Sequence, residues 1–152
     1  MRPLKSFVIL ALVFGCDSPT GPNPIYPSYY LTNIDGKYLP IPWGGDGSVL
    51  IDASLRFDRD TRPRKPTPTD GIVHSTLTIR ALDQTLARST VDLSYTIRNG
   101  ELRINLCPPL VLCFALTELV GPVPDHGLEL VLTHYVGGLP VAVYHYSAAL
   151  LE

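Results

Sequence analysis

The 152-residue sequence predicts an all-β domain built as an antiparallel meander. Segments 48–58 and 73–81 alternate apolar and polar residues with a period of two, which is typical of half-buried strands. An Asn99-Gly100 pair lies between two further alternating segments and is a strong signal for a two-residue hairpin. Fifteen prolines and twelve glycines disfavour long helices and favour many turns.

Segments 48–58 and 73–81 each place most of their apolar residues on one face. In segment 48–58 the predicted core face holds Val49, Ile51, Ala53, Leu55 and Phe57, with Leu50 as an exception on the polar face. In segment 73–81 it holds Val73, Leu77, Ile79 and Ala81, while His74, Thr76, Thr78 and Arg80 point the other way.

The Asn99-Gly100 turn fixes a register in which both strands sort their side chains correctly. The predicted pairs on the core face are Ile97 with Leu102, Tyr95 with Ile104 and Leu93 with Leu106. On the other face Arg98 opposes Glu101, Thr96 opposes Arg103 and Ser94 opposes Asn105. A second hairpin is expected at Gly137-Gly138, between segments 128–135 and 139–147.

From Tyr29 onward we expect eight or nine strands that close into a barrel or fold into a sandwich. Segment 110–120 is apolar on both predicted faces. It is interpreted either as a central strand covered on each side or as a barrel strand that faces a ligand, a partner or a membrane. Trp43 is expected to cover a barrel mouth or to plug one end of the core.

The opening segment 29–40 carries the pattern Tyr-x-Leu, a β-branched residue, Asp35-Gly36 and Leu39-Pro40. This pattern resembles the first strand and turn of small lipocalin-like lipoproteins of environmental bacteria. The resemblance covers about twelve residues and implies a lipocalin-like barrel. The Gly-x-Trp signature of true lipocalins is absent from this strand.

The N-terminus has the organisation of a secretory signal. Arg2 and Lys5 precede an apolar core over residues 7–14, and the small Gly15 follows. Eight helical residues would span about 12 Å, far less than the roughly 30 Å hydrocarbon core of a membrane.

The junction Val13-Phe14-Gly15-Cys16 resembles the lipobox of bacterial lipoproteins. The resemblance implies cleavage before Cys16 and acylation of this residue on its sulfur and its amine. The four-proline stretch 17–28 predicts an extended tether on the order of 35 Å long. We therefore expect a signal peptide at 1–15, a lipidated cysteine and tether at 16–28, and an all-β domain at 29–152. The sequence leaves open whether the anchoring membrane is the inner or the outer one.

Cys107 and Cys113 are predicted to form a disulfide, since oxidation is the default for paired cysteines in an exported protein. Zinc would require more ligands than the sequence offers, and redox catalysis would favour Cys-x2-Cys. Cys107 is expected to leave one strand through a tight turn, and Cys113 to open the next strand.

His134 and His145 are a candidate pair of metal-binding residues, because each is followed by a tyrosine in one of the two strands of the predicted hairpin. With a two-residue turn at Gly137-Gly138, His134 would face Val141, and His145 would share its face at about 13 Å along the strand. That separation is too large for one ion, so no metal site is predicted. His74 and His126 are expected on the surface.

No cofactor and no catalytic residue is predicted, because the recognisable hydrolase, metalloprotease, phosphate-loop and dinucleotide motifs are missing. The net charge of −2 becomes −4 without Arg2 and Lys5, which disfavours nucleic-acid binding. Segment 59–71 carries four cations and three prolines, and is interpreted as a solvated loop.

Two functional hypotheses follow, both for a non-enzymatic lipoprotein outside the cytoplasm, anchored by lipid to a membrane of the cell envelope. In the first, a tethered barrel holds a small apolar ligand or lipid. In the second, a β-domain with a filled core presents loops to a protein partner of the envelope.

Overall fold

A computed structural model of the chain describes residues 28–58, 70–108, 111–123 and 128–148. These residues form ten strands and contain no helix. The strands are β1 (Ser28–Ile34), β2 (Lys37–Tyr38), β3 (Ile41–Trp43), β4 (Ser48–Phe57), β5 (Asp70–Arg80), β6 (Leu86–Arg98), β7 (Glu101–Asn105), β8 (Thr117–Pro122), β9 (Glu129–Val136) and β10 (Leu139–Ala148). The first strand begins at Ser28, the last residue of the expected tether.

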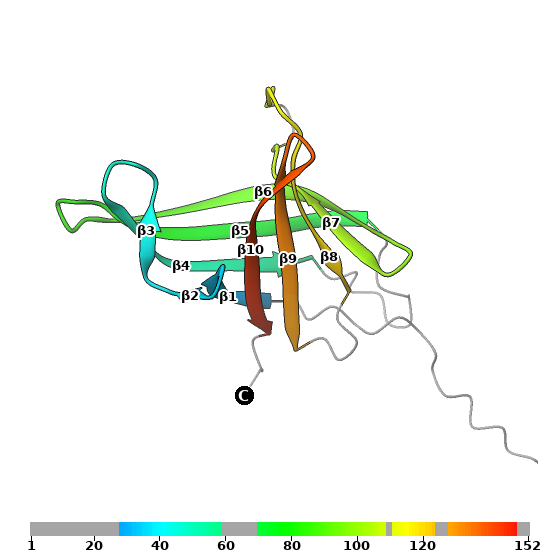
Figure 1. The fold of residues 1–152 in the computed structure, drawn as a ribbon, viewed down its shortest axis with the longest axis horizontal. Helices are drawn as coiled ribbons and strands as arrows, with labels where there is room; N and C mark the ends of the chain where they lie inside the picture. Colours follow the sequence, from blue (N-terminus) through cyan, green and yellow to red (C-terminus); the bar gives the residue numbers. More distant parts are fainter. Residues whose placement is uncertain (1–27, 59–69, 109–110, 124–127, 149–152) are drawn as a thin grey trace, which may run out of the picture.

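Eight of these strands close into an antiparallel barrel, which confirms the all-β meander and decides between barrel and sandwich. β4 to β10 pair in chain order, and β1 pairs with both β10 and β4, so the sheet returns to its start. The short strands β2 and β3 extend the sheet beside β1 and β4. In Figure 1, β4, β5 and β6 run across the view, while β9 and β10 cross them at a steep angle.

Both predicted hairpins are present. The register of β6 and β7 runs from Tyr95 opposite Ile104 to Arg98 opposite Glu101, as predicted. The pairing ends there, so the predicted pairs of Ser94 with Asn105 and of Leu93 with Leu106 are not observed, and the Leu106 amide instead donates to the carbonyl of Thr117. Asn99 and Gly100 have φ values of 52° and 76°, the left-handed conformation that a tight hairpin turn of this kind requires. The β9–β10 hairpin likewise turns at Gly137-Gly138.

Large apolar side chains fill the barrel interior. Phe57 packs edge-on against both Tyr29 and Tyr95, with ring centroids 6.1 and 5.1 Å apart. The most completely buried side chains come from several different strands and belong to Tyr29, Leu50, Leu55, Val73, Leu102, Ile104, Leu130 and Leu132. Trp43 packs against this core from β3, half-buried.

A bulge in β4 corrects the predicted faces of its first half. The β4–β5 register shifts between Leu50 and Asp52, so that one extra residue, Ile51, interrupts the alternation. Leu50 is consequently fully buried, whereas Val49 and Ile51 are only half-buried. The apparent exception in the sequence pattern is therefore a core residue.

The apolar segment 110–120 is not a single strand, and the prediction that Cys113 opens a strand was wrong. β8 begins only at Thr117, and residues 111–116 form a loop with exposed side chains. The half of the segment that becomes β8 does contribute Leu119 to the core. Apolar composition alone does not separate a buried strand from an exposed apolar loop.

β6 is longer than its partner on one side. Residues Tyr95–Arg98 pair with β7, whereas residues Leu86–Thr96 pair with β5 without a shift. The outer part of the β5–β6 hairpin therefore projects past β7, as Figure 1 shows. Among the described residues, this part of β6 has a partner strand on one side only.

Candidate functional site: an apolar rim and two polar surface pockets

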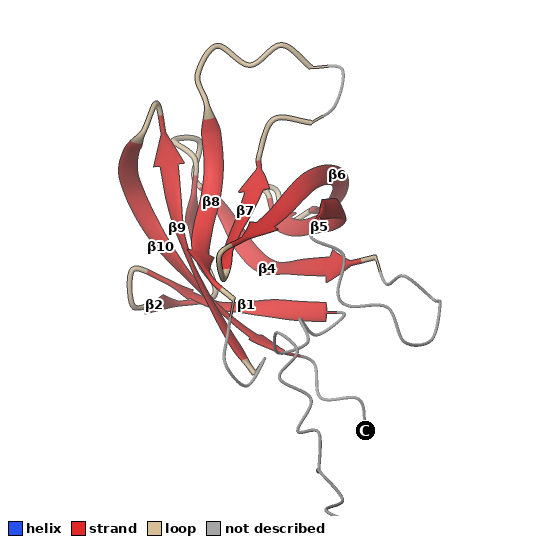
Figure 2. Cartoon of the chain, turned by 90° about the vertical axis from the view of Figure 1, so that its right-hand side faces the viewer, coloured by secondary structure: helices blue, strands red, loops and turns tan. Residues whose placement is uncertain are grey.

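The most unusual surface of the protein lies at the end of the barrel that carries the β9–β10 turn. Leu112 is 95% exposed, Phe114 is fully exposed, and the other large apolar side chains nearby are also exposed. Figure 2 shows the β7–β8 loop reaching beyond the ends of its strands. We call this surface the apolar rim and define it as Val111, Leu112, Phe114, Leu116, Leu139 and Val141.

Covalent and hydrogen-bonded contacts fix the rim loop to the barrel. Cys107 and Cys113 form the predicted disulfide, with their Cα atoms 6.0 Å apart. The Leu106 amide donates to the carbonyl of Thr117, which closes the base of the loop at 2.9 Å. The Gly137 amide donates to the carbonyl of Leu116 at 2.8 Å and so joins the loop to the β9–β10 turn.

The rim also lacks charge. The sequence has no Asp, Glu, Lys or Arg between residues 106 and 116 or between residues 130 and 148. Contiguous exposed apolar surface without charge is a mark of sites that bind a protein or a membrane. Chemically, the rim can bury apolar area but offers no group for acid, base or nucleophilic work.

The first polar pocket has a volume of about 330 Å³ and lies on the outer face of β1, β4, β5 and β6. A row of residues with hydroxyl groups runs across the four strands on this face. Tyr30 lies opposite Ser54, Ser54 opposite Thr76, and Thr76 opposite Thr90. The hydroxyls of Thr76 and Thr90 share a 3.0 Å hydrogen bond. Arg56, His74 and Arg88 also line the pocket.

His74 is held between two carboxylates at the edge of this pocket. Its Nδ1 lies 2.6 Å from Oδ1 of Asp92, and its Nε2 lies 2.9 Å from Oδ1 of Asp58. Carboxylates accept hydrogen bonds and do not donate them, so the doubly protonated imidazolium satisfies both contacts. The hydrogen bond to Asp92, followed by that to Asp58, raises the pKa of His74.

The sequence predicts the position of His74 but not of its two carboxylate partners, Asp58 and Asp92. The alternation of segment 73–81 places His74 on the outer face, as expected. Its partner Asp58 directly follows β4, and its partner Asp92 lies on β6. Only the strand registers bring them together, since Arg56 lies opposite His74 and His74 lies opposite Asp92. Both ring nitrogens of His74 are engaged by carboxylates, so neither is free to accept a proton from a hydroxyl of this pocket.

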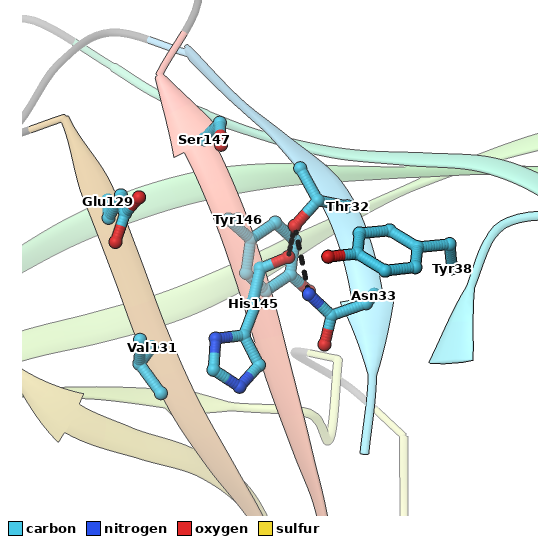
Figure 3. Close-up of a pocket in the computed structure, with 8 residues that line it drawn as sticks. All are labelled: Thr32, Asn33, Tyr38, Glu129, Val131, His145, Tyr146 and Ser147. Carbon is cyan, nitrogen blue, oxygen red and sulfur yellow. Dashed lines mark hydrogen bonds between the residues drawn. The ribbon is translucent and has the colours of Figure 1, made fainter. Parts of the chain in front are cut away.

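The second polar pocket, of about 250 Å³, lies on the outer face where β1, β9 and β10 meet (Figure 3). The Thr32 hydroxyl donates to the carbonyl of His145 at 2.9 Å, and the Asn33 amide donates to that hydroxyl at 3.4 Å. The side chains of Tyr38 and His145 lie beside these bonds in Figure 3. Small polar pockets of this kind can bind water or a small polar solute.

His134 and His145 lie on opposite faces of the sheet, which corrects the predicted register. A bulge between Pro140 and Ala142 places Ala142, rather than Val141, opposite His134, and Val131 opposite His145. Residues 142 and 145 are an odd number apart, so their side chains point to opposite faces. His134 faces inward against the ring of Tyr144, and burial lowers its pKa.

Several predicted positions lie outside the described residues, namely Cys16, His126 and segment 59–69. Asp70 and Gly71, assigned to that loop from the sequence, instead begin β5. Within the described part of the chain, no three His, Cys, Asp or Glu side chains come together as metal ligands do. The described residues also include no helix long and apolar enough to span a bilayer.

Comparisons of the chain with protein-family models, with the curated proteins and with the solved structures gave no match. The candidate sites are therefore interpreted from their own chemistry.

Proposed function

We propose that the protein is a non-enzymatic lipoprotein of the cell envelope, anchored through Cys16, whose barrel binds a partner protein with its apolar rim. The observation that carries this proposal is the full exposure of Leu112 and Phe114 on a loop that a disulfide holds in place. Among the described surfaces, the apolar rim is the one best suited to contact a partner protein.

The energetics of the rim support a binding role. Burying a Leu or Phe side chain is worth roughly 1.5–3 kcal/mol, so two such residues could anchor a protein interface. A flexible loop would lose much of this energy in ordering itself. The Cys107–Cys113 bridge and the Gly137 hydrogen bond lower that cost by holding the loop in place before binding.

The direction of the rim supports a partner other than the anchoring membrane. Tyr29 pairs with Ala148, at the end of β10 remote from the β9–β10 turn. The proposed anchor at Cys16 precedes Ser28 by twelve positions, so the tether joins the barrel at the end opposite the rim. An upright barrel would then present its rim to proteins located away from that membrane.

The filled interior favours this role over the alternative of a small apolar ligand. Large side chains of the described strands, among them Tyr29, Phe57 and Tyr95, are buried in the barrel interior and pack against one another, which leaves less room there for an apolar ligand. Native mass spectrometry of the full chain tests the alternative directly, because a stoichiometric bound lipid would favour ligand carriage.

The rim is tested by photo-crosslinking in cells that express the full chain. A photoreactive amino acid at position 112 or 114 should capture one defined envelope protein. The same residue at Leu82, which is 72% exposed in the β5–β6 turn, is the matched control and should capture nothing comparable. Leu112→Asp should weaken capture from position 114, and Leu82→Asp should not. Capture of lipid alone, or equal capture from all three positions, would overturn the proposal.

The anchor is tested separately. Cys16→Ser should move the protein from the membrane fraction to the soluble fraction, because it removes the acceptor of the proposed acyl chains. Persistence in the membrane fraction would show that another segment anchors the chain.

A further inference from the structure

The barrel leaves one long strand edge open. Between Leu86 and Ser94, β6 pairs with β5 on one side, and no strand of the described residues pairs with it on the other. Residues 86–92 are all exposed. Thr90, Val91 and Asp92 border a groove of about 480 Å³ that separates this edge from Pro108.

This edge carries few of the features that usually protect an edge strand. Proteins block such edges with bulges, prolines and lysines. The β5–β6 register has no shift along its whole length, and residues 86–94 contain no Pro, Gly or Lys. No strand of the described part of the chain pairs with the outward-pointing backbone N–H and C=O groups of residues 86–94, so another strand can pair with them.

The ends of the free edge limit how a second copy of this strand could pair with it. The β5–β6 turn closes the edge before Leu86, and β7 covers it from Tyr95 onward. Only one antiparallel register pairs all nine residues with their counterparts. In that register Thr90 faces Thr90 of the other copy, and Leu86 faces Ser94.

The charges of the edge agree with this register. Arg88 and Asp92 are the only charged residues of the edge, and they lie two positions on either side of Thr90. Each arginine would therefore lie directly opposite an aspartate of the other copy, on the same face of the joined sheet. Opposite charges in such cross-strand positions are favourable, whereas like charges are unfavourable.

Because the register set by the ends of the edge also pairs opposite charges, we propose that two copies of the chain dimerise through the free edge of β6. The two strands would be antiparallel and centred on Thr90. The joined sheet would run from β5 through both β6 strands to the second β5. The interface uses a different surface from the apolar rim, so a dimer would present two rims.

Cysteine crosslinking of the full chain in detergent tests the register. Thr90→Cys should form an intermolecular disulfide under mild oxidation, because directly opposed residues have Cα atoms about 4.5–5.5 Å apart. Arg88→Cys and Leu86→Cys are the matched controls, since each would lie about 13 or 26 Å from its own counterpart. Strong crosslinking at position 90 with little at 86 and 88 supports the proposal. Equal crosslinking at all three positions, or none at position 90, overturns it.

Charge reversal gives a second test that needs no crosslink. Arg88→Asp should weaken the dimer about tenfold, because two carboxylates would then face each other at positions 88 and 92 of opposite copies. The double variant Arg88→Asp/Asp92→Asn should recover most of the dimer, as measured by native mass spectrometry, because it removes the opposed carboxylates while the amide oxygen introduced at position 92 still accepts the hydrogen bond from His74. A chain that stays monomeric in the unmodified form, or a double variant as weak as the single, contradicts the proposal. Leu112→Asp should leave the Thr90→Cys crosslink intact, which separates this inference from the rim.

Discussion

Nδ1 of His74 on β5 lies 2.6 Å from Oδ1 of Asp92, the residue directly opposite on β6. Asp58, next to the end of β4, holds the second ring nitrogen at 2.9 Å. Three neighbouring strand segments are thus linked on the outer face by one protonated side chain. Because these hydrogen bonds raise the pKa of His74, we expect the stability of the fold to depend on pH.

His74 should stabilise the fold most strongly at low pH. Its folded pKa is raised, so the stabilisation is fully present below the unfolded value near 6.5 and is lost as pH rises through the folded pKa. The free energy of unfolding, measured by urea denaturation, should therefore fall as the pH rises above about 6.5. His74→Gln should flatten this dependence. An unchanged slope in the variant would mean that another group titrates.

His134 should act in the opposite direction. Burial lowers its pKa, and its Nε2 is buried and has no hydrogen-bond partner among the residues that the structure describes. Because the unfolded state binds the proton more readily, stability should fall as pH drops below about 6.5. His134→Gln should reduce this loss of stability on the acid side. A variant that loses stability as steeply as the parent chain would assign the effect elsewhere.

Gly121 of β8 is expected to be intolerant of any side chain. A Cβ at this position would overlap the carbonyl oxygen of Val131 on the neighbouring strand β9. Gly121→Ala should therefore destabilise the barrel by roughly 1–3 kcal/mol, since backbone must move to admit the methyl group. Gly45→Ala is the matched control, because a Cβ there meets no atom within 4 Å. Equal thermal midpoints for the two variants would contradict this prediction.

The Cys107–Cys113 bridge should contribute to both stability and rim geometry. Closing so short a ring is worth roughly 2–3 kcal/mol in the loop-entropy model. The double variant Cys107→Ser/Cys113→Ser should lower the free energy of unfolding by about that amount. It should also reduce capture from position 114, while the Thr90→Cys crosslink persists. Undiminished capture would show that the rim needs no covalent support.

Truncation of a buried side chain provides a reference for the size of these changes in the free energy of unfolding. Leu132 is fully buried, and Leu132→Ala should cost about 2–5 kcal/mol through lost burial and the cavity left behind. Leu86 is 66% exposed at the start of β6, so Leu86→Ala should change stability by less than about 0.5 kcal/mol. Denaturant midpoints of the two variants provide the comparison.

Local chemistry in the sequence determined much of the barrel. Two residues that tolerate positive φ at Asn99-Gly100, followed by correct alternation on both sides, left one register for β6 and β7, and this register is observed for the four pairs next to the turn. The pairing of Cys107 with Cys113 likewise followed from their proximity in the chain and from the expected oxidising compartment. The signal, the lipidated Cys16 and the proposed binding role remain predictions from the sequence.

Only the tertiary structure decided the features that depend on strand register or on what covers a segment. One-residue bulges beside Leu50 and Pro140 reversed the faces assigned by simple alternation, because each extra residue shifts the phase of a period-two pattern. Residues 111–116 were expected in a strand because they are apolar, yet no described strand pairs with them. The His74 cluster, the free edge of β6 and the closure of β1 on β4 arise from contacts between distant residues, which no local pattern encodes.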